Sequence, residues 1–158
     1  MARLVLLCGL PGSGKTTVAR ALAAELGAIR FCPDEWMSAL ELDLFDEPIR
    51  ARIESVQWNL AQELLQRGVS VVIEWGVWAR SERDTVRERA RELGVPVELH
   101  YLDVPLDVLW ERVRARNDSG PPGTANISYE NLVDWSEHLF EPPTAEEQAL
   151  FDPPSSRP

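Results

Sequence analysis

Eight consecutive residues near the N-terminus have the types and the spacing of a phosphate-binding loop. They match the pattern G-x-x-x-x-G-K-[ST] in full, as Gly9-Leu10-Pro11-Gly12-Ser13-Gly14-Lys15-Thr16. The glycines let successive backbone N–H groups face one anion at the start of a helix. At average composition, a chance match in a chain this short is expected well under about one time in a hundred. The motif therefore predicts a nucleotide site.

The residues that end the motif predict ATP and Mg²⁺ as cofactors. Lys15 carries a positive charge that we expect between the β- and γ-phosphates, and the hydroxyl of Thr16 is a ligand for Mg²⁺. Phosphate oxygens and water are expected to complete the metal's coordination. We expect the nucleotide to contact Gly9, Pro11, Gly12, Ser13, Gly14, Lys15, Thr16 and Thr17.

The rest of the chain narrows the class of P-loop protein. A GTPase carries a guanine-reading Asn/Thr-Lys-x-Asp segment, and the sequence contains none. Large ATPases have an apolar strand that ends in Asp for the metal, whereas the corresponding run here ends in Glu74. A small chain with arginines after its fourth predicted strand favours a kinase for a nucleotide or a metabolite.

The apolar pattern predicts strands that alternate with helices. Four short apolar runs predict strands at residues 3–8, 29–32, 69–73 and 95–102. Helical spacing between them predicts a parallel sheet covered on both faces, with ligands at the carboxyl ends of the strands. The predicted fold class is α/β, a three-layer P-loop NTPase fold of the nucleoside- and nucleotide-kinase type with four to five parallel strands.

Helix ends and faces can also be predicted. Ser81 and Asp84 have the form of a capping pair for the helix after the third strand, and Ser128 that of an N-cap for a later helix. In the long helix before the third strand, the buried face is expected at the apolar residues spaced three or four apart, which are Ile53, Val56, Leu60 and Leu64.

We expect one domain over residues 1–145, with a short lid at about 117–127, and a proline-rich tail over 146–158. Residues 118–126 gather Ser, Gly and Pro, as in a loop. P-loop kinases usually add a last strand beside the first one, and no apolar run of strand length follows Phe140. Either residues 144–150, where one helical turn is expected, take its place, or the sequence ends before it. The adenine pocket and the choice between ATP and GTP stay open.

Charge and cysteine content bound the partners. The net charge of −10, from 26 acidic and 16 basic residues, disfavours nucleic acid as a partner. Cys8 and Cys32 lie in apolar runs, which is typical of buried thiols in a reducing compartment. The apolar run at 4–8 is too short for a membrane helix or a signal peptide. We expect a cytoplasmic monomer or homodimer without a membrane partner.

Several short motifs together resemble one family. They are Gly9 to Thr17, Pro33-Asp34-Glu35-Trp36, Glu74-Trp75-Gly76-Val77-Trp78, Leu102-Asp103-Val104-Pro105, Arg112, Arg116 and Phe140-Glu141-Pro142-Pro143. Over roughly residues 1–145 the sequence resembles the small P-loop kinase-like family that includes chloramphenicol phosphotransferases, zeta toxins and the kinase domain of phage polynucleotide kinase. In that family ATP donates its γ-phosphoryl group to a hydroxyl group, and an acidic residue after the second strand faces the acceptor.

The resemblance implies catalytic roles for Asp34, Arg112 and Arg116, beside Lys15. A carboxylate at Asp34 can orient an acceptor hydroxyl and take its proton; alternatively, Asp34 only caps the following helix. Arg112 and Arg116 lie four residues apart, and the resemblance makes them lid arginines that clamp the phosphates. Alternatively, they form a solvated helix face paired with Glu111.

Four further residues are predicted to lie near the acceptor, together with Asp34. Glu74 follows the third strand and is expected to hold the acceptor or a Mg²⁺-bound water. Arg83 either reaches the acceptor or a phosphate, or lies on a solvated basic helix face. Trp36 and Trp78 follow strand ends and either line an aromatic acceptor pocket or belong to the core.

The combined prediction is an ATP-dependent phosphotransferase that acts on a hydroxyl group of a small-molecule acceptor, with antibiotics, nucleosides and sugars all open. One alternative is a regulatory switch that binds and hydrolyses ATP without an acceptor, in which Asp34 and Glu74 position water. A polynucleotide 5′-hydroxyl kinase is a further alternative, disfavoured by the acidic charge. The intact Lys15 and Thr16 argue against a degenerate loop without chemistry.

Overall fold

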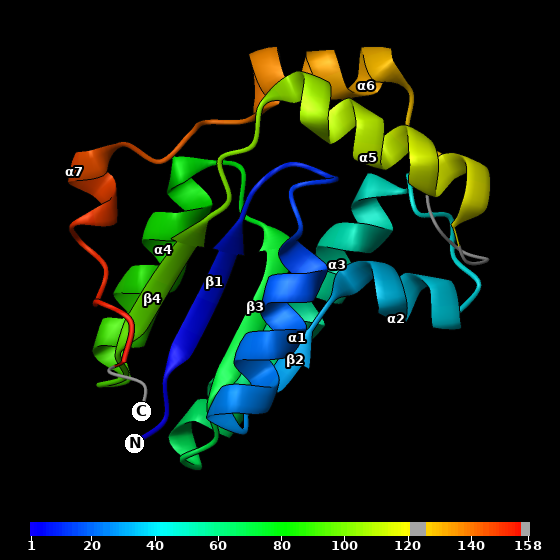
Figure 1. The fold of residues 1–158 in the computed structure, drawn as a ribbon. Coiled ribbons are helices and arrows are strands. Elements are labelled where there is room, and N and C mark those ends of the chain that lie inside the picture. Colours follow the sequence, from blue (N-terminus) through cyan, green and yellow to red (C-terminus); the bar gives the residue numbers. More distant parts are fainter. Residues whose placement is uncertain (121–125, 156–158) are drawn as a thin grey trace.

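Four parallel strands form the middle layer of the fold: β1 (Leu4–Cys8), β2 (Ile29–Phe31), β3 (Val71–Gly76) and β4 (Val97–Tyr101). Their order across the sheet is β2-β3-β1-β4 (Figure 1). The computed structural model describes residues 1–120 and 126–155. Leu6 of β1 pairs with Ile73 on one side and Leu99 on the other. The predicted α/β class with parallel strands is confirmed.

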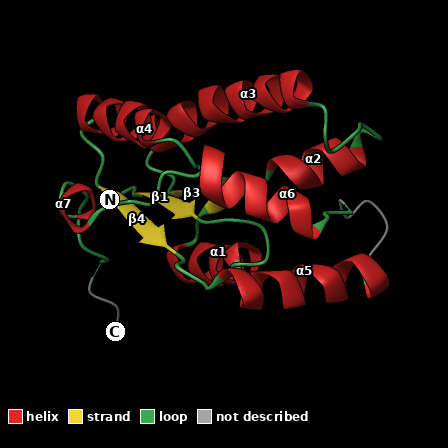
Figure 2. Ribbon diagram, turned by 90° about the horizontal axis from the view of Figure 1, so that it is seen from above, coloured by secondary structure: helices red, strands yellow, loops and turns green. Residues whose placement is uncertain are grey.

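Helices surround this sheet. Their bounds are α1 (Lys15–Leu26), α2 (Pro33–Ala39), α3 (Glu47–Gln66), α4 (Arg80–Glu92), α5 (Leu106–Ser119), α6 (Tyr129–Asp134), the π-helix η1 (Trp135–Leu139) and α7 (Ala145–Gln148). Figure 2 shows α3 and α4 on one side of the sheet and α1 on the other. Figure 1 shows α5 and α6 above the carboxyl ends of the strands. In the part of the chain that the structure describes, no helix has the length and apolarity to cross a membrane.

Apolar side chains attach the helices to both faces of the sheet. Because neighbouring residues of a strand point to opposite faces, Leu4 and Leu6 of β1 pack in the cluster that includes residues of α3 and α4. Val5 and Leu7 instead pack against α1. β1 is therefore fully buried, which explains its continuous apolar sequence.

The buried face of α3 differs from the prediction by one residue. Gln57, Ala61 and Leu65 are buried, whereas the predicted Val56 and Leu60 are 55% and 41% exposed. The predicted Leu64 is partly buried and packs against the core. The apolar pattern missed this face because it contains a polar residue. The side-chain oxygen of Gln57 accepts a hydrogen bond of 2.8 Å from Nε1 of Trp75 in β3, whereas its side-chain nitrogen has no hydrogen-bond partner among the described residues.

One of the two predicted helix caps is correct. Ser128 caps α6, because its Oγ accepts a hydrogen bond of 3.1 Å from the backbone N–H of Asn131. The capping pair predicted at Ser81 and Asp84 is wrong. The N-cap position is two residues earlier, at Ala79, with no side-chain cap, and Asp84 forms an ion pair of 2.7 Å with Arg87 inside the helix.

The predicted lid falls partly on α5 and partly outside the described residues, which omit 121–125. α5 continues to Ser119, so the loop predicted from residue 118 begins later, because the Ser119 hydroxyl bonds to the Ala115 carbonyl within the last helical turn. The side chain of Asn117, near the end of α5, is hydrogen-bonded to the backbone of Ile127. It donates to the carbonyl of Ile127 (2.7 Å) and accepts from the N–H of Ile127 (3.2 Å).

The C-terminal segment packs on the outer edge of β4. The backbone N–H of Asp152 donates to the carbonyl of Val97 (2.8 Å), and the N–H of Val97 donates to the Asp152 carboxylate (2.7 Å). Phe151 joins the core at 8% exposure. The helical turn expected at 144–150 is present as α7. Among the described residues, β1 has β3 on one side and β4 on the other. These two strands occupy both positions beside β1, where a last strand is expected.

Candidate functional site

The phosphate loop connects β1 to α1, as the motif predicts. Gly12 and Gly14 have φ angles of 85° and 94°, in the left-handed region that favours glycine. Gly12 also lies against α5. A Cβ atom at this position would come within 2.9 Å of the Leu109 carbonyl oxygen and 3.0 Å of Val113, so a larger residue would displace α5 from the loop.

Lys15 at the start of α1 turns back into the loop. Its Nζ donates to the carbonyl oxygens of Gly9 (3.0 Å) and Leu10 (2.9 Å). Burial lowers the pKa of the Lys15 ammonium to about 8, while the negative charges of Glu74 and Asp34 act in the opposite direction. The lysine charge and the two carboxylates thus lie close enough to influence one another.

Thr16 and Glu74 meet beside this lysine. The Thr16 hydroxyl donates a hydrogen bond to Oε1 of Glu74, whose carboxylate is buried at the end of β3. A hydroxyl and a carboxylate oxygen are ligands that suit Mg²⁺. No cluster of three or more His, Cys, Asp or Glu side chains able to hold a metal occurs in residues 1–120 and 126–155. The pair therefore fits a Mg²⁺ ion that takes most of its ligands from the nucleotide and water.

Arg30 extends this group of charges, and sequence reasoning missed it. Its Nη1 donates to Oε2 of Glu74 at 2.7 Å, and its Nη2 donates to both carboxylate oxygens of Glu35 at 2.7 and 2.6 Å. Arg30 is a single basic residue within the short strand β2, and nothing in the local sequence distinguishes it from a surface arginine. Only the parallel pairing of β2 with β3 brings it beside Glu74.

Asp34 lies in the first turn of α2 and remains 58% exposed. The alternative that it caps this helix is wrong, because Cys32 occupies the N-cap position and no side chain caps α2. Instead, Asp34 forms an ion pair of 2.6 Å with Arg50 of α3. Arg50, which sequence reasoning also missed, further donates to the carbonyl of Leu44 at 2.9 Å.

Glu54 is a third residue that the sequence did not single out. It lies one helical turn after Arg50 and is partly buried. Burial first, and then repulsion by Glu82, raises the pKa of the Glu54 carboxyl to about 7, while Arg50 acts in the opposite direction. A carboxyl with a perturbed pKa, which the charge of Asp34 also raises, is typical of functional sites.

The two predicted lid arginines lie on α5 with their side chains exposed. Arg112 contacts the phosphate loop, since its Nη1 donates to the carbonyl of Gly12 at 3.1 Å. The positive charge of Arg116 is one of those that lower the pKa of Lys15. In the described part of the chain, neither arginine forms an ion pair with Glu111, so the alternative of a paired solvated face is not observed.

Arg83 has a different place from both of those predicted for it. It is 0% exposed, so it is not on a solvated helix face. Its guanidinium bonds to both carboxylate oxygens of Glu147 (2.6 and 3.0 Å) and to the carbonyls of Val77, Trp78 and Glu141. These acceptors use all five N–H donors of an arginine, and none remains for an acceptor molecule.

The predicted aromatic residues are divided between the core and the phosphate loop. Trp36 packs edge-on to Phe31, with ring centroids 6.0 Å apart, and borders the core under α3 and α4. Trp78 contacts the loop directly, because its Nε1 donates to the carbonyl of Gly9 at 3.1 Å. It also packs on Trp135 of η1 at 5.5 Å.

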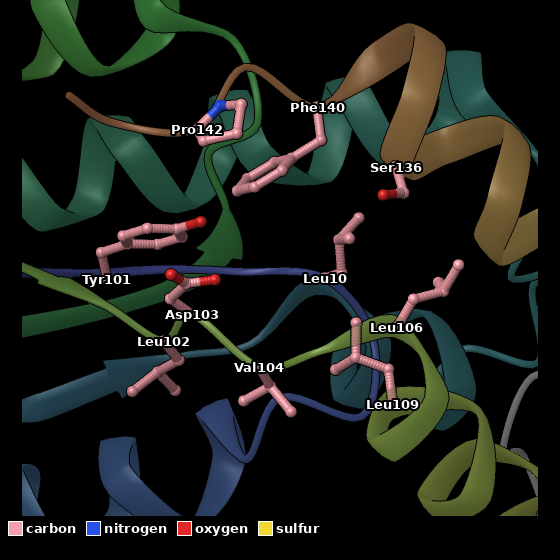
Figure 3. Close-up of a pocket in the computed structure, with 10 residues that line it drawn as sticks. All are labelled: Leu10, Tyr101, Leu102, Asp103, Val104, Leu106, Leu109, Ser136, Phe140 and Pro142. Atoms are coloured by element: carbon pink, nitrogen blue, oxygen red, sulfur yellow. The ribbon is translucent and has the colours of Figure 1, made fainter.

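A pocket of about 160 Å³ adjoins the phosphate loop at Leu10 (Figure 3). Tyr101 and Phe140 line it with their ring centroids 6.0 Å apart, and Asp103 lies beside Tyr101. Burial and the neighbouring Asp103 carboxylate raise the pKa of Tyr101 to about 12. The sequence did not predict this pocket, because its walls come from β4, α5, η1 and the segment after η1.

Comparisons with known proteins agree with this architecture. A sequence model of a protein family described as an AAA domain matches residues 4–143. The structure is similar to a gluconokinase from Sinorhizobium meliloti 1021, with 24% identity, 92% of this chain and 79% of that chain covered, and a TM-score of 0.62. It is also similar to a sugar kinase from Janibacter sp. HTCC2649, with 25% identity, 93% and 82% covered, and a TM-score of 0.63.

A chain of the Pnkp1/Rnl/Hen1 RNA repair complex is a third similar structure, with 21% identity and a TM-score of 0.70. The similarity covers 96% of this chain but 46% of that one, so this chain spans less than half of its length. A search of curated proteins found no match. At these identities, the solved structures establish a P-loop kinase-like fold and leave the acceptor open.

Proposed function

The chain belongs to the AAA-domain family of P-loop kinase-like proteins, and from this premise we propose that it transfers the γ-phosphoryl group of ATP to a hydroxyl group of a small-molecule acceptor. The observation that carries this proposal is the position of Asp34. An exposed carboxylate lies at the same edge of the sheet as Lys15, near enough to act on the lysine charge.

The donor half of the reaction uses the phosphate loop and α5. The loop's backbone N–H groups and Lys15 hold the phosphates, and Arg112 and Arg116 approach from α5 to neutralise charge on the transferred group. Thr16 and Glu74 would hold Mg²⁺, which, when bound, offsets charge on the β- and γ-phosphates. Phosphoryl transfer depends mainly on such positioning and charge neutralisation.

The acceptor half uses Asp34. Its carboxylate accepts the proton of the acceptor hydroxyl while that oxygen forms a bond to the γ-phosphorus and the bond between this phosphorus and ADP breaks. Arg50 holds the carboxylate in place from α3. Trp78, bonded to the phosphate loop, borders the same edge, and we expect it to contact the acceptor. Trp36 packs on the core, so we expect it to contact the acceptor less than Trp78 does.

The test measures ADP release from Mg²⁺-ATP with separate pools of nucleosides, sugars and hydroxylated antibiotics, and with an oligonucleotide that has a free 5′-hydroxyl. We expect one small-molecule pool to raise turnover, and Asp34→Ala to remove the increase by a factor on the order of 10² or more while ATP still binds. Asp107→Ala is the matched control, because Asp107 is an exposed carboxylate on α5 outside the site.

The other outcomes select the alternatives. A slow basal rate that no pool changes, together with a silent Asp34→Ala, would instead favour the regulatory switch. Stimulation by the oligonucleotide alone would indicate a polynucleotide 5′-hydroxyl kinase, a reaction to which the similarity with the RNA repair complex draws attention. Equal loss of activity in Asp34→Ala and Asp107→Ala would exclude a specific role for Asp34.

A further inference from the structure

A network of charged and polar side chains runs from the phosphate loop to the protein surface. Thr16 bonds to Glu74, and Glu74 bonds to Arg30. Arg30 then bonds through two contacts to Glu35, which pairs with Arg20 at 3.1 Å. The exposure of the side chains rises along this network, from 4% for Glu74 and 16% for Arg30 to 46% for Glu35 and 65% for Arg20.

The direction of each hydrogen bond matters for a cation at Thr16. A hydroxyl has one proton to donate, and Thr16 donates it to Oε1 of Glu74. The lone pairs of the Thr16 oxygen are therefore left for a metal. This orientation is stable only while the Glu74 carboxylate stays in one rotamer, and the contact from Arg30 to Oε2 holds its second oxygen.

Arg30 in turn has a fixed position. Its planar guanidinium bonds to Glu74 through one nitrogen and to both oxygens of Glu35 through the other, which sets the plane of the fork. A lysine would offer one point charge and would not reach both carboxylates in this way. Because both terminal nitrogens already bond to carboxylates, the contacts favour a role towards Glu74 over direct binding of an acceptor.

We propose that Arg30 is a positioning residue of the metal–nucleotide site, which fixes Glu74 so that the Thr16 hydroxyl presents its lone pairs to Mg²⁺. The inference relies on the proposed function in one respect, which is that the phosphate loop binds a nucleotide together with Mg²⁺. It concerns the donor side and requires no acceptor. Partners that orient metal ligands in this way typically change metal affinity or activity by about 10- to 100-fold when removed.

The experiment titrates Mg²⁺ into the full chain saturated with a non-hydrolysable ATP analogue. Binding is followed by calorimetry and by tryptophan fluorescence, since Trp75 is next to Glu74 in β3. For Arg30→Ala we expect at least about a 10-fold weaker half-saturation by Mg²⁺, with metal-free nucleotide affinity unchanged. Arg30→Lys is expected to be impaired as well, because it keeps the charge but loses the fork. Arg20→Ala, at the exposed end of the side-chain network, is the matched control, and its Mg²⁺ half-saturation should equal that of the wild type.

Each contrary result has its own meaning. Unchanged Mg²⁺ half-saturation in a folded Arg30→Ala protein would overturn the proposal and leave Arg30 as a structural ion pair. An Arg30→Lys protein equal to the wild type would show that charge alone matters. If Arg30→Ala does not fold, the Mg²⁺ half-saturation of Arg30→Lys and Glu35→Gln is measured instead, and wild-type values in both variants would overturn the proposal. If the wild-type complex itself takes up no Mg²⁺, the proposed kinase function fails together with this inference, whereas absence of any acceptor would affect only the former.

Discussion

Two regions of the molecule bring arginines and carboxylates together, with different results. Where the C-terminal segment meets α4, Arg83 and Glu147 are 0% and 1% exposed, and every N–H of Arg83 has an acceptor. Beside α2 and α3, Asp34 is 58% exposed and pairs with Arg50 at 24%. There, Glu54 is partly buried with a raised pKa and has no hydrogen-bond partner among the described residues.

The difference separates scaffold from site. A buried ion pair with all its hydrogen bonds made leaves nothing for a ligand. Through Arg83 it connects residues 141 and 147 to the loop after β3. Carboxylates and arginines that keep solvent contact, or lack partners, can exchange their contacts for those of a substrate. We therefore expect changes in the first region to affect stability and changes in the second to affect catalysis.

The largest expected effect is on stability, from Glu147→Ala. Removing the carboxylate leaves the Arg83 charge buried and unpaired, and breaking a buried pair in this way costs about 3–5 kcal/mol. Urea unfolding at pH 7 measures the change, with the exposed neighbour Glu146→Ala as the control. A loss within about 1 kcal/mol, the size expected of a surface pair, would contradict the view that this region is scaffold.

The second expected effect is on catalysis, from Arg50→Ala. Without Arg50 the Asp34 carboxylate is free to rotate, and misplacement of a reacting group lowers phosphotransfer by about 10- to 100-fold. Because the pair is partly exposed, stability should change by less than about 1 kcal/mol. Arg52→Ala, on an exposed face of α3, is the control. The comparison would break down if Arg50→Ala unfolded the protein as readily as Glu147→Ala.

A smaller effect with a pH signature is expected from Glu54→Gln. The Glu54 carboxyl has a pKa of about 7 in the fold against an ordinary value of 4.5. As pH rises between these values, the unfolded chain loses the proton first, so stability falls, and the penalty is constant above about 7. Glu54→Gln should therefore stabilise the protein by about 1–2 kcal/mol at pH 8 and hardly at pH 4.

Thermal and urea unfolding at the two pH values test this prediction, with the exposed Glu88→Gln as the control. Equal stabilisation at both pH values would mean that the amide acts through packing and not through the charge of Glu54. No stabilisation at either value would remove the evidence that the second region keeps a carboxylate with a raised pKa.

Local sequence was sufficient for the phosphate loop and the four strands. Gly9 to Thr16 form one contiguous motif, and β1 and the first three residues of β3 are continuous apolar runs because both faces of these strands are buried. The Asp34 and Arg112 positions came from a family resemblance. The structure places Arg112 against the loop and Asp34 in the first turn of α2, paired with Arg50, while their roles in the reaction stay predictions.

Partners distant in sequence account for what was missed. Arg30 meets Glu74 across 44 residues and Arg83 meets Glu147 across 64, so neither pair leaves a periodic or local signal. Arg83 shows the consequence, since its position at the start of α4 suggested solvent or substrate and its true partner lies in the C-terminal segment. Gln57 misled the helix pattern in the same way, because its partner Trp75 belongs to β3.

Lys15 is the only lysine in the chain, and all other basic side chains apart from the two histidines are arginines. Reagents that acylate amines react with the unprotonated form, which the pKa of about 8 makes abundant at mildly alkaline pH. Apart from the terminal amine, such a reagent has a single target, inside the phosphate loop. A bound triphosphate would shield that target, so the added mass of one acyl group becomes a direct record of which molecules in a sample had an empty loop.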